Sequence, residues 1–181
     1  MSTSRAERAA AGGAAAAAPA QEEEDERERI IHASCVAFQS REDGVCAGVL
    51  IRGPAGAGKS SFALMLMGFG AALVADDCVR LSRGGDGRLW ATAPDEPALS
   101  GLIEARGVGV IRVAPTTAAA LAWVVDLASA ASLERLPALR CERMLGATLP
   151  RLSAPPSAAA AAAVACLARG GTLLDPDAAL R

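Results

Sequence analysis

The chain of 181 residues has little that would suit it to nucleic acid or to a membrane. Tyrosine is absent, aromatic residues make up 3% of the chain, and the formal net charge is −2. Binding nucleic acid calls for a basic surface and often for aromatic stacking platforms, so this composition argues against such a partner. No run of about 18 strongly apolar residues could span a membrane, and the start lacks the pattern of a secretory signal. We therefore expect a cytoplasmic protein with neither a nucleic-acid nor a membrane partner.

Cysteine spacing excludes two further classes of protein. The five cysteines form no C-x-x-C pair and no cluster with histidine, so they fit neither a disulfide framework nor a zinc site. Their pattern favours a reduced compartment, and each is expected to be a small buried apolar residue. They are Cys35, Cys46, Cys78, Cys141 and Cys166.

Composition divides the chain into three parts. Residues 1–29 are rich in alanine and glycine and then in acids, and residues 1–28 contain no leucine, isoleucine, valine or phenylalanine. Such a segment cannot bury enough apolar surface to fold, so we expect a disordered tail. The apolar texture that starts at residue 30 predicts one domain over 30–170, and 171–181 is expected to be a loose C-terminal tail.

One short motif carries most of the chemical information. The only lysine of the chain lies inside the pattern G-x-x-x-x-G-K-S. In this pattern the glycines let backbone amides close around a polyphosphate, the lysine reaches the terminal phosphates, and the serine hydroxyl helps to hold magnesium. The predicted nucleotide-binding residues are Gly53, Pro54, Ala55, Gly56, Ala57, Gly58, Lys59 and Ser60.

The flanks of the motif have the order that it requires. The apolar run 49–51 predicts a buried strand before the loop, and 61–67 predicts a helix that is apolar nearly all round. Residues 71–75 predict another short strand, which ends abruptly in Asp76 and Asp77. Two carboxylates at this strand end are expected to face the phosphates.

The remaining elements are predicted with less detail. Residues 30–38 read as a strand followed by a polar turn over 39–44, and 79–89 read as two strands around a glycine turn. Residues 102–113 are strand-like with two spaced glycines. Residues 118–130 fit a helix or a buried strand, and the β-branched content of 123–127 favours the strand. Ser157 predicts the cap of a helix that reaches about residue 169 and ends at two glycines.

Taken together, four features resemble the catalytic domain of bacterial HPr kinase/phosphorylase. They are Ile31-His32, the glycine-rich loop, the strand end Val74 to Asp77, and the segment Glu104-Ala105-Arg106-Gly107-Val108-Gly109-Val110. They occur in the matching order, and the resemblance covers residues 30–113. It implies an α/β (mixed α+β) fold: a single P-loop domain with a nucleotide-binding core like that of phosphoenolpyruvate carboxykinase, in the short form that lacks the N-terminal domain of longer members.

The resemblance also implies an activity. The family's enzymes are ATP- and Mg²⁺-dependent serine kinases that phosphorylate the phosphocarrier HPr, can reverse the reaction by phosphorolysis, and regulate the phosphotransferase system. An HPr-like protein is therefore the expected partner, and assembly into a homo-oligomer is compatible with the family.

Roles are carried over residue by residue. Lys59 would hold the β- and γ-phosphates, and Ser60 and Glu104 would hold magnesium. The pair Asp76 and Asp77 would supply the catalytic base and a further metal contact, assigned to Asp77, and the sequence leaves open which of the two is the base.

Two further residues complete the predicted catalytic set. His32, the only histidine, would orient or tune the catalytic aspartate. Arg106 would either face the phosphates or form a salt bridge.

One departure from the family keeps other functions open. Longer members carry a Pro-Gly-Arg segment whose arginine assists phosphorolysis, whereas residues 149–156 contain none, and Arg151 is the available stand-in. An ATP-sensing module with reduced catalysis and a small-molecule kinase therefore remain as alternatives.

Overall fold

The computed structural model describes residues 27–39, 44–95 and 100–174. The predicted tail over 1–29 therefore lies almost wholly outside the described residues, as do residues 40–43 of the predicted turn and residues 175–181. The first strand begins at Glu28, two residues before the expected start of the domain.

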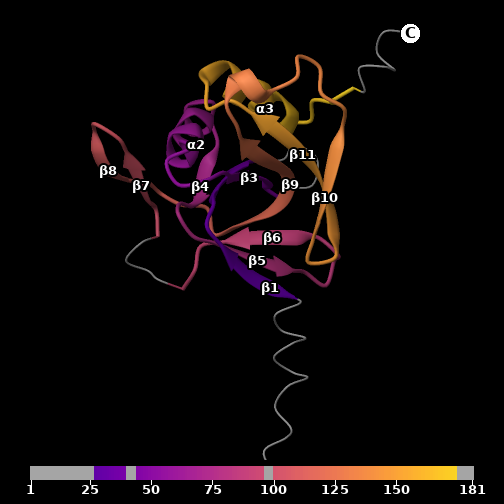
Figure 1. Cartoon of the computed structure of the whole chain (residues 1–181). Helices are drawn as coiled ribbons and strands as arrows, with labels where there is room; N and C mark the ends of the chain where they lie inside the picture. The colour runs from indigo at the N-terminus through magenta and orange to yellow at the C-terminus, as the bar shows by residue number, and fades with distance from the viewer. Residues whose placement is uncertain (1–26, 40–43, 96–99, 175–181) are drawn as a thin grey trace, which may run out of the picture.

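A nine-stranded mixed sheet forms the body of the protein, and a separate two-stranded hairpin stands beside it (Figure 1). The main sheet contains β1 (Glu28–Ile31), β2 (Ser34–Phe38), β3 (Ala47–Arg52), β4 (Ala72–Ala75), β5 (Val79–Arg83), β6 (Leu89–Thr92), β9 (Ala118–Leu127), β10 (Arg140–Met144) and β11 (Ala147–Ala154). The hairpin consists of β7 (Leu102–Ala105) and β8 (Gly109–Arg112). Within the described residues the helices are α2 (Lys59–Gly68), α3 (Ala158–Ala168) and the short 3-10 helix η1 (Ala130–Ser132).

Strand β9 is long enough to organise the sheet. It runs parallel to β3 on one side, while on the other side its first residues pair with β6 and its last four pair with β11. Two strands, β6 and β11, thus pair with the same edge of β9, and the sheet is curled (Figure 1). The result is a mixed α/β fold with a curled sheet.

Both faces of the central strands are buried. On β2, Val36 and Phe38 face a cluster that includes α2 and α3, while Cys35 and Ala37 face a second cluster inside the curl. Side chains alternate across a strand, so this continuous burial explains why β2 and β3 are apolar without an alternating polar pattern. The two helices cover the same face of the sheet (Figure 1).

Several predicted elements are confirmed, and one is wrong in detail. The predicted strand 49–51 lies in β3, the helix 61–67 lies in α2, and the ambiguous segment 118–130 contains strand β9. The single strand expected over 30–38 is instead two strands that break at His32 and Ala33. The break is needed because β1 pairs with β5, whereas β2 pairs with β3 and β4.

The cysteine prediction is also corrected. Cys35 is buried and its thiol pKa is raised by burial, but Cys46 is only half-buried and the other three are exposed. The physical reason is their position, since Cys78 follows the turn after β4, Cys141 lies on β10, whose pairing partner is β11, and Cys166 faces outward on α3. No helix among the described residues is long and apolar enough to cross a membrane.

Candidate active site around the glycine-rich loop

The loop between β3 and α2 uses backbone conformations that favour glycine. Gly56 and Gly58 have φ values of 78° and 92°, in the left-handed region that side chains disfavour. Gly58 is the N-cap of α2, and its carbonyl accepts the first helical hydrogen bond, from the amide of Phe62, at 2.8 Å. The loop therefore ends where the positive end of the α2 dipole begins.

Lys59 is buried against this loop although it carries a charge. Only 6% of the residue is exposed, and its Nζ donates to the carbonyl oxygens of Gly53 at 3.2 Å and Pro54 at 3.3 Å. Burying an ammonium is costly unless hydrogen bonds compensate for the lost water. The loop carbonyls provide that compensation, and they hold the ammonium at the mouth of the loop.

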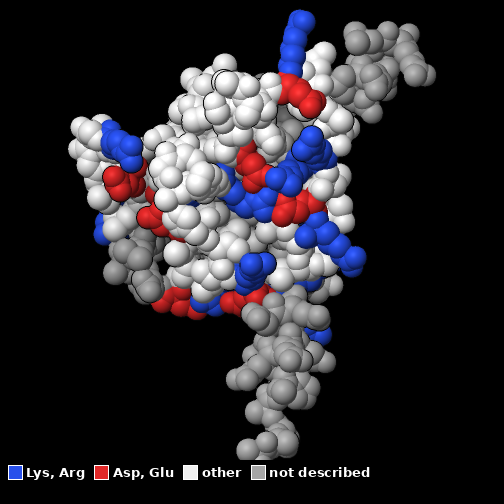
Figure 2. Space-filling view, viewed as in Figure 1, with Lys and Arg blue, Asp and Glu red and all other residues white. Residues whose placement is uncertain are grey.

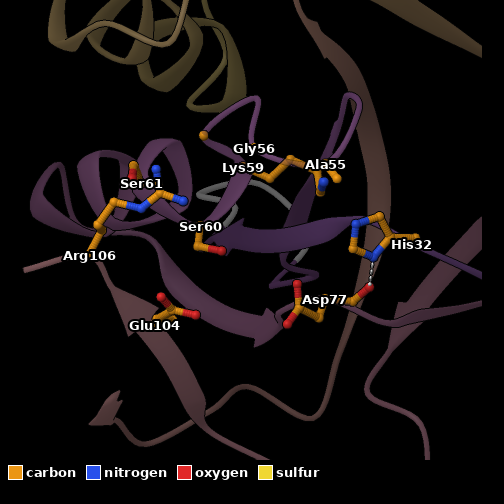
Figure 3. A pocket seen from close by; sticks show the side chains of 10 residues that line it. His32, Ala55, Gly56, Lys59, Ser60, Ser61, Asp77, Glu104 and Arg106 are labelled. Atoms are coloured by element: carbon orange, nitrogen blue, oxygen red, sulfur yellow. Dashed lines mark hydrogen bonds between the residues drawn. The ribbon is translucent and has the colours of Figure 1, made fainter. Parts of the chain in front are cut away.

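A cavity of about 270 Å³ opens in front of the loop. Most of the predicted site residues meet there, from segments that are far apart in the sequence (Figure 3). Its lining residues are His32, Ala55, Gly56, Gly58, Lys59, Ser60, Ser61, Asp77, Glu104 and Arg106. Gly53, Pro54 and Ala57 belong to the same loop but do not line the cavity.

The two aspartates after β4 diverge. Asp77 lines the cavity, whereas Asp76 accepts a 2.5 Å hydrogen bond from the hydroxyl of Ser34 and lies outside the set of cavity-lining residues. Asp77 has φ of 65°, so the chain turns sharply between the two side chains. Of the two carboxylates expected to face the phosphates, only that of Asp77 lines the cavity in front of the loop.

His32 contacts the backbone of this turn. Its Nδ1 lies 2.9 Å from the carbonyl oxygen of Asp77, as the dashed line in Figure 3 shows. A carbonyl oxygen can only accept, so Nδ1 carries the proton in this contact. His32 thus binds the backbone of Asp77 through Nδ1, and its Nε2 takes no part in this hydrogen bond.

Glu104 and Arg106 reach the cavity from the hairpin. Glu104 lies on β7 between two buried neighbours, Ile103 and Ala105, so the strand alternation turns its carboxylate outward. In Figure 3 the carboxylates of Asp77 and Glu104 lie on either side of the Ser60 hydroxyl. Arg106 lies near Ser61 in the same view. Sequence reasoning did not name Ser61 as a site residue, because the motif ends one residue earlier, at Ser60.

A second group of charges lies where β3 leads into the loop. Arg52 binds Asp126 through Nε at 2.8 Å and Glu142 through Nη1 at 2.7 Å, and Arg151 also donates to Asp126. We call Arg52, Asp126, Glu142 and Arg151 the charge tetrad. In Figure 2 blue and red side chains lie side by side in the region where Figure 1 shows β9, β10 and β11. Sequence reasoning missed the tetrad, because its members lie on four different strands.

The tetrad shifts the titration of its own members. Burial raises the pKa of Asp126, but hydrogen bonds from Arg52 and Arg151 outweigh that effect and lower it. The pKa of Glu142 is lowered mainly by its hydrogen bond to Arg52, and the pKa of Arg52 is raised mainly by the same bond. Both carboxylates are thus held in their charged form.

Metal-binding capacity follows from the residues present. Among the residues described by the structure, no group of three or more His, Cys, Asp or Glu side chains is placed to hold a metal ion. The cavity offers the hydroxyls of Ser60 and Ser61 and the carboxylates of Asp77 and Glu104. Oxygen donors of this kind suit Mg²⁺, which usually takes one or two carboxylates together with phosphate and water.

Comparison with known proteins places these features in a family. The family model described as "HPr Serine kinase C-terminal domain" matches residues 28–121. The chain is 48% identical over 66 residues to the HPr kinase/phosphorylase of Exiguobacterium sibiricum and 46% identical over 66 residues to that of Bacillus subtilis. Each match covers 36% of this chain and 21% of the relative, so it spans about a fifth of the relatives' length.

The structural match covers more of the chain. The HPr(Ser) kinase/phosphatase of Coxiella burnetii superposes with a TM-score of 0.63 and 26% identity, over 77% of this chain and 87% of that one. The family match extends over more than half of the 181 residues and agrees with the shared fold. The chain therefore belongs to the HPr serine kinase C-terminal domain family.

Proposed function

We propose that the protein is an ATP-dependent serine kinase that phosphorylates an HPr-like phosphocarrier protein in the cytoplasm and so regulates the phosphotransferase system. The observation that carries this proposal is the convergence of Lys59, Ser60, Asp77 and Glu104 on one cavity in front of the glycine-rich loop. Membership of the family supports the choice of substrate.

The loop and Lys59 would bind the nucleotide. Backbone amides of the loop and the N-terminus of α2 suit a polyphosphate, and the Lys59 ammonium can neutralise the β- and γ-phosphates. We infer that 53–60 functions as a P-loop within a core like that of phosphoenolpyruvate carboxykinase. Mg²⁺, held by Ser60 and Glu104 with an oxygen of Asp77, would supply further charge neutralisation.

We propose Asp77, which lines the cavity, as the catalytic base. It would take the proton from the incoming serine hydroxyl as that oxygen attacks the γ-phosphorus and the bond to the β-phosphate oxygen breaks. Arg106 lines the same cavity, where its guanidinium would stabilise the transferring phosphoryl group. In reverse, the protonated carboxyl would return its proton to the serine oxygen.

The structure favours the kinase direction over phosphorolysis. Arg151, the stand-in for the arginine of the Pro-Gly-Arg segment, is paired with Asp126 and lies outside the cavity in front of the loop. An arginine held in this way would have to leave an ion pair before it could reach phosphate. We therefore propose that transfer from ATP is the main reaction of this chain.

A transfer assay tests the proposal. Purified protein is mixed with Mg²⁺, ATP and an HPr-like protein, and mass spectrometry locates any phosphate on the acceptor. Phosphoserine formed by the wild type and lost in Asp77→Asn is the expected result. ATP binding by calorimetry without transfer to any acceptor would instead support the sensing module, and transfer to a metabolite alone would support a small-molecule kinase.

A further inference from the structure

Three consecutive residues hold the turn that carries the two aspartates. At the break between β1 and β2, the His32 ring and the Ala33 amide both donate to the carbonyl oxygen of Asp77, at 2.9 and 3.3 Å. The Ser34 hydroxyl donates to Oδ1 of Asp76 at 2.5 Å. The strand break that sequence analysis missed therefore places three donors against one turn.

The turn needs such support because Asp77 is in the left-handed region. Its φ of 65° is unfavourable for residues other than glycine, although aspartate tolerates it better than most. Conformations of this kind are strained and persist only where surrounding contacts impose them. Here two hydrogen bonds fix the Asp77 carbonyl, and a third fixes the preceding side chain.

Ser34 is well suited to fix Asp76. It is one of two buried polar or charged residues found among the described parts of the chain, with 0% exposure. Its hydroxyl is on a short side chain and has little room to move, and a hydrogen bond to an ionised carboxylate is stronger than one between neutral groups. The bond directs the Asp76 carboxylate away from the cavity that Asp77 lines.

We propose that Asp76 is a positioning residue, tied to Ser34, whose role is to hold the left-handed turn that points the Asp77 carboxylate into the cavity. His32 and Ala33 complete the same clamp through the Asp77 carbonyl. The inference rests on the proposed function for the role of Asp77, but the clamp itself is a property of the fold.

Kinetics separate a positioning role from direct participation. Asp77→Asn removes the base and should lower kcat by roughly 100-fold or more. Ser34→Ala and Asp76→Ala should each lower kcat by about 10-fold with the KM for ATP unchanged, and the double variant should be no worse than either single one. Asp76→Asn keeps an oxygen that can accept from Ser34, so its loss should be smaller than that of Asp76→Ala.

Controls keep the kinetic test interpretable. Ser132→Ala removes an exposed serine that bonds within its own turn, and it should leave kcat unchanged. Thermal unfolding of each variant shows whether it folds. If Asp76→Ala does not fold, Asp76→Asn replaces it in the kinetic test. An Asp76→Asn variant as inactive as Asp77→Asn, with normal ATP binding, would overturn the proposal because Asp76 would then take part in the chemistry.

A second measurement needs no activity. His32 is the only histidine, so the ¹⁵N imidazole signals of the chain are unambiguous. With the ring neutral, the proton should lie on Nδ1, and this tautomer should lose population in Ser34→Ala and Asp76→Ala but not in Asp77→Asn. An Nε2–H tautomer in the wild type, or no response to Ser34→Ala, would overturn the clamp. If the wild type transfers no phosphate but shows the Nδ1–H tautomer and these responses, the proposed function fails and the clamp stands.

Discussion

Two clusters of charge adjoin the ends of the glycine-rich loop, and they are built on opposite principles. Before the loop, the four members of the charge tetrad bind one another through short hydrogen bonds. After the loop, Lys59, Asp77, Glu104 and Arg106 converge on a cavity, and in the described chain no ion pair joins any of them to another residue. The first cluster is satisfied by the fold, and the second has capacity left for a ligand.

The difference shows how similar side chains come to serve structure or chemistry. In the tetrad, the charged groups have exchanged water for one another as hydrogen-bond partners. Removing one member therefore leaves the remaining charges partly buried and unpaired. The exposed Asp77, Glu104 and Arg106 keep access to water around the cavity, and a triphosphate with its metal can replace that water. Each of the following predictions tests whether this division is right.

The largest expected effect comes from the cavity. Lys59→Met should lower kcat/KM for ATP by about 100- to 1,000-fold, because a positioned charge near a transferring phosphoryl group stabilises the transition state strongly. The unfolding free energy should change by less than about 1 kcal/mol, since the partners of the Lys59 ammonium among the described residues are loop carbonyls. Steady-state kinetics and urea unfolding measure the two quantities. A large loss of stability would mean that Lys59, like the charge tetrad, mainly stabilises the fold.

The next effect should appear in the tetrad. Arg52→Met should lower the unfolding free energy by about 2–3 kcal/mol, because Asp126 and Glu142 lose their shared donor while side chains of this cluster are only 20–40% exposed. Urea unfolding measures this loss. Arg143→Met, the same change at an exposed site on β10, is the matched control and should fall within about 0.5 kcal/mol of the wild type. Equal effects of the two variants would contradict a stabilising tetrad.

Acid should weaken the tetrad in a defined direction. The pKa values of Asp126 and Glu142 are lower in the folded protein than in the unfolded chain, so the folded state binds protons less readily. The stabilisation is therefore complete above about pH 4.5 and is lost as the pH falls through the folded values. The stability difference between wild type and Arg52→Met should narrow below that pH by about 1–2 kcal/mol. A difference that stays constant from pH 7 to pH 3 would refute the proposed charge pairing.

The smallest effect calibrates the other three. Ser157 caps α3 by accepting from the amide of Ala160 at 3.3 Å, and it belongs to neither cluster. Ser157→Ala should lower the unfolding free energy by about 0.5–1 kcal/mol, as loss of an N-cap does. Ser157→Asp should retain most of the capping stabilisation, because aspartate is also a good N-cap. Thermal unfolding detects the change. If Ser157→Ala and Arg52→Met lowered the unfolding free energy equally, the tetrad would stabilise the fold no more than a single helix cap does.

Local sequence signals were sufficient for much of the fold. The glycine-rich loop, the buried helix after it, the strand over 123–127 and the cap at Ser157 were predicted because their cues lie within a few residues. Strands β10 and β11 were not predicted at all. Their sequences carry charged residues and Pro150, and only the pairing of β10 with β11 and of β11 with β9 makes them strands.

For the candidate site, the sequence by itself determined which residue types were present: one lysine on a glycine-rich loop, a serine beside it, and an acidic pair at a strand end. The tertiary structure alone decided how they are used. It separated Asp77 from Asp76 by a left-handed turn, brought Glu104 across from a distant hairpin, and joined four strands through the charge tetrad. The reason is that residue type fixes what a side chain can do chemically, whereas its partners are set by non-local strand pairing, which no short stretch of sequence encodes.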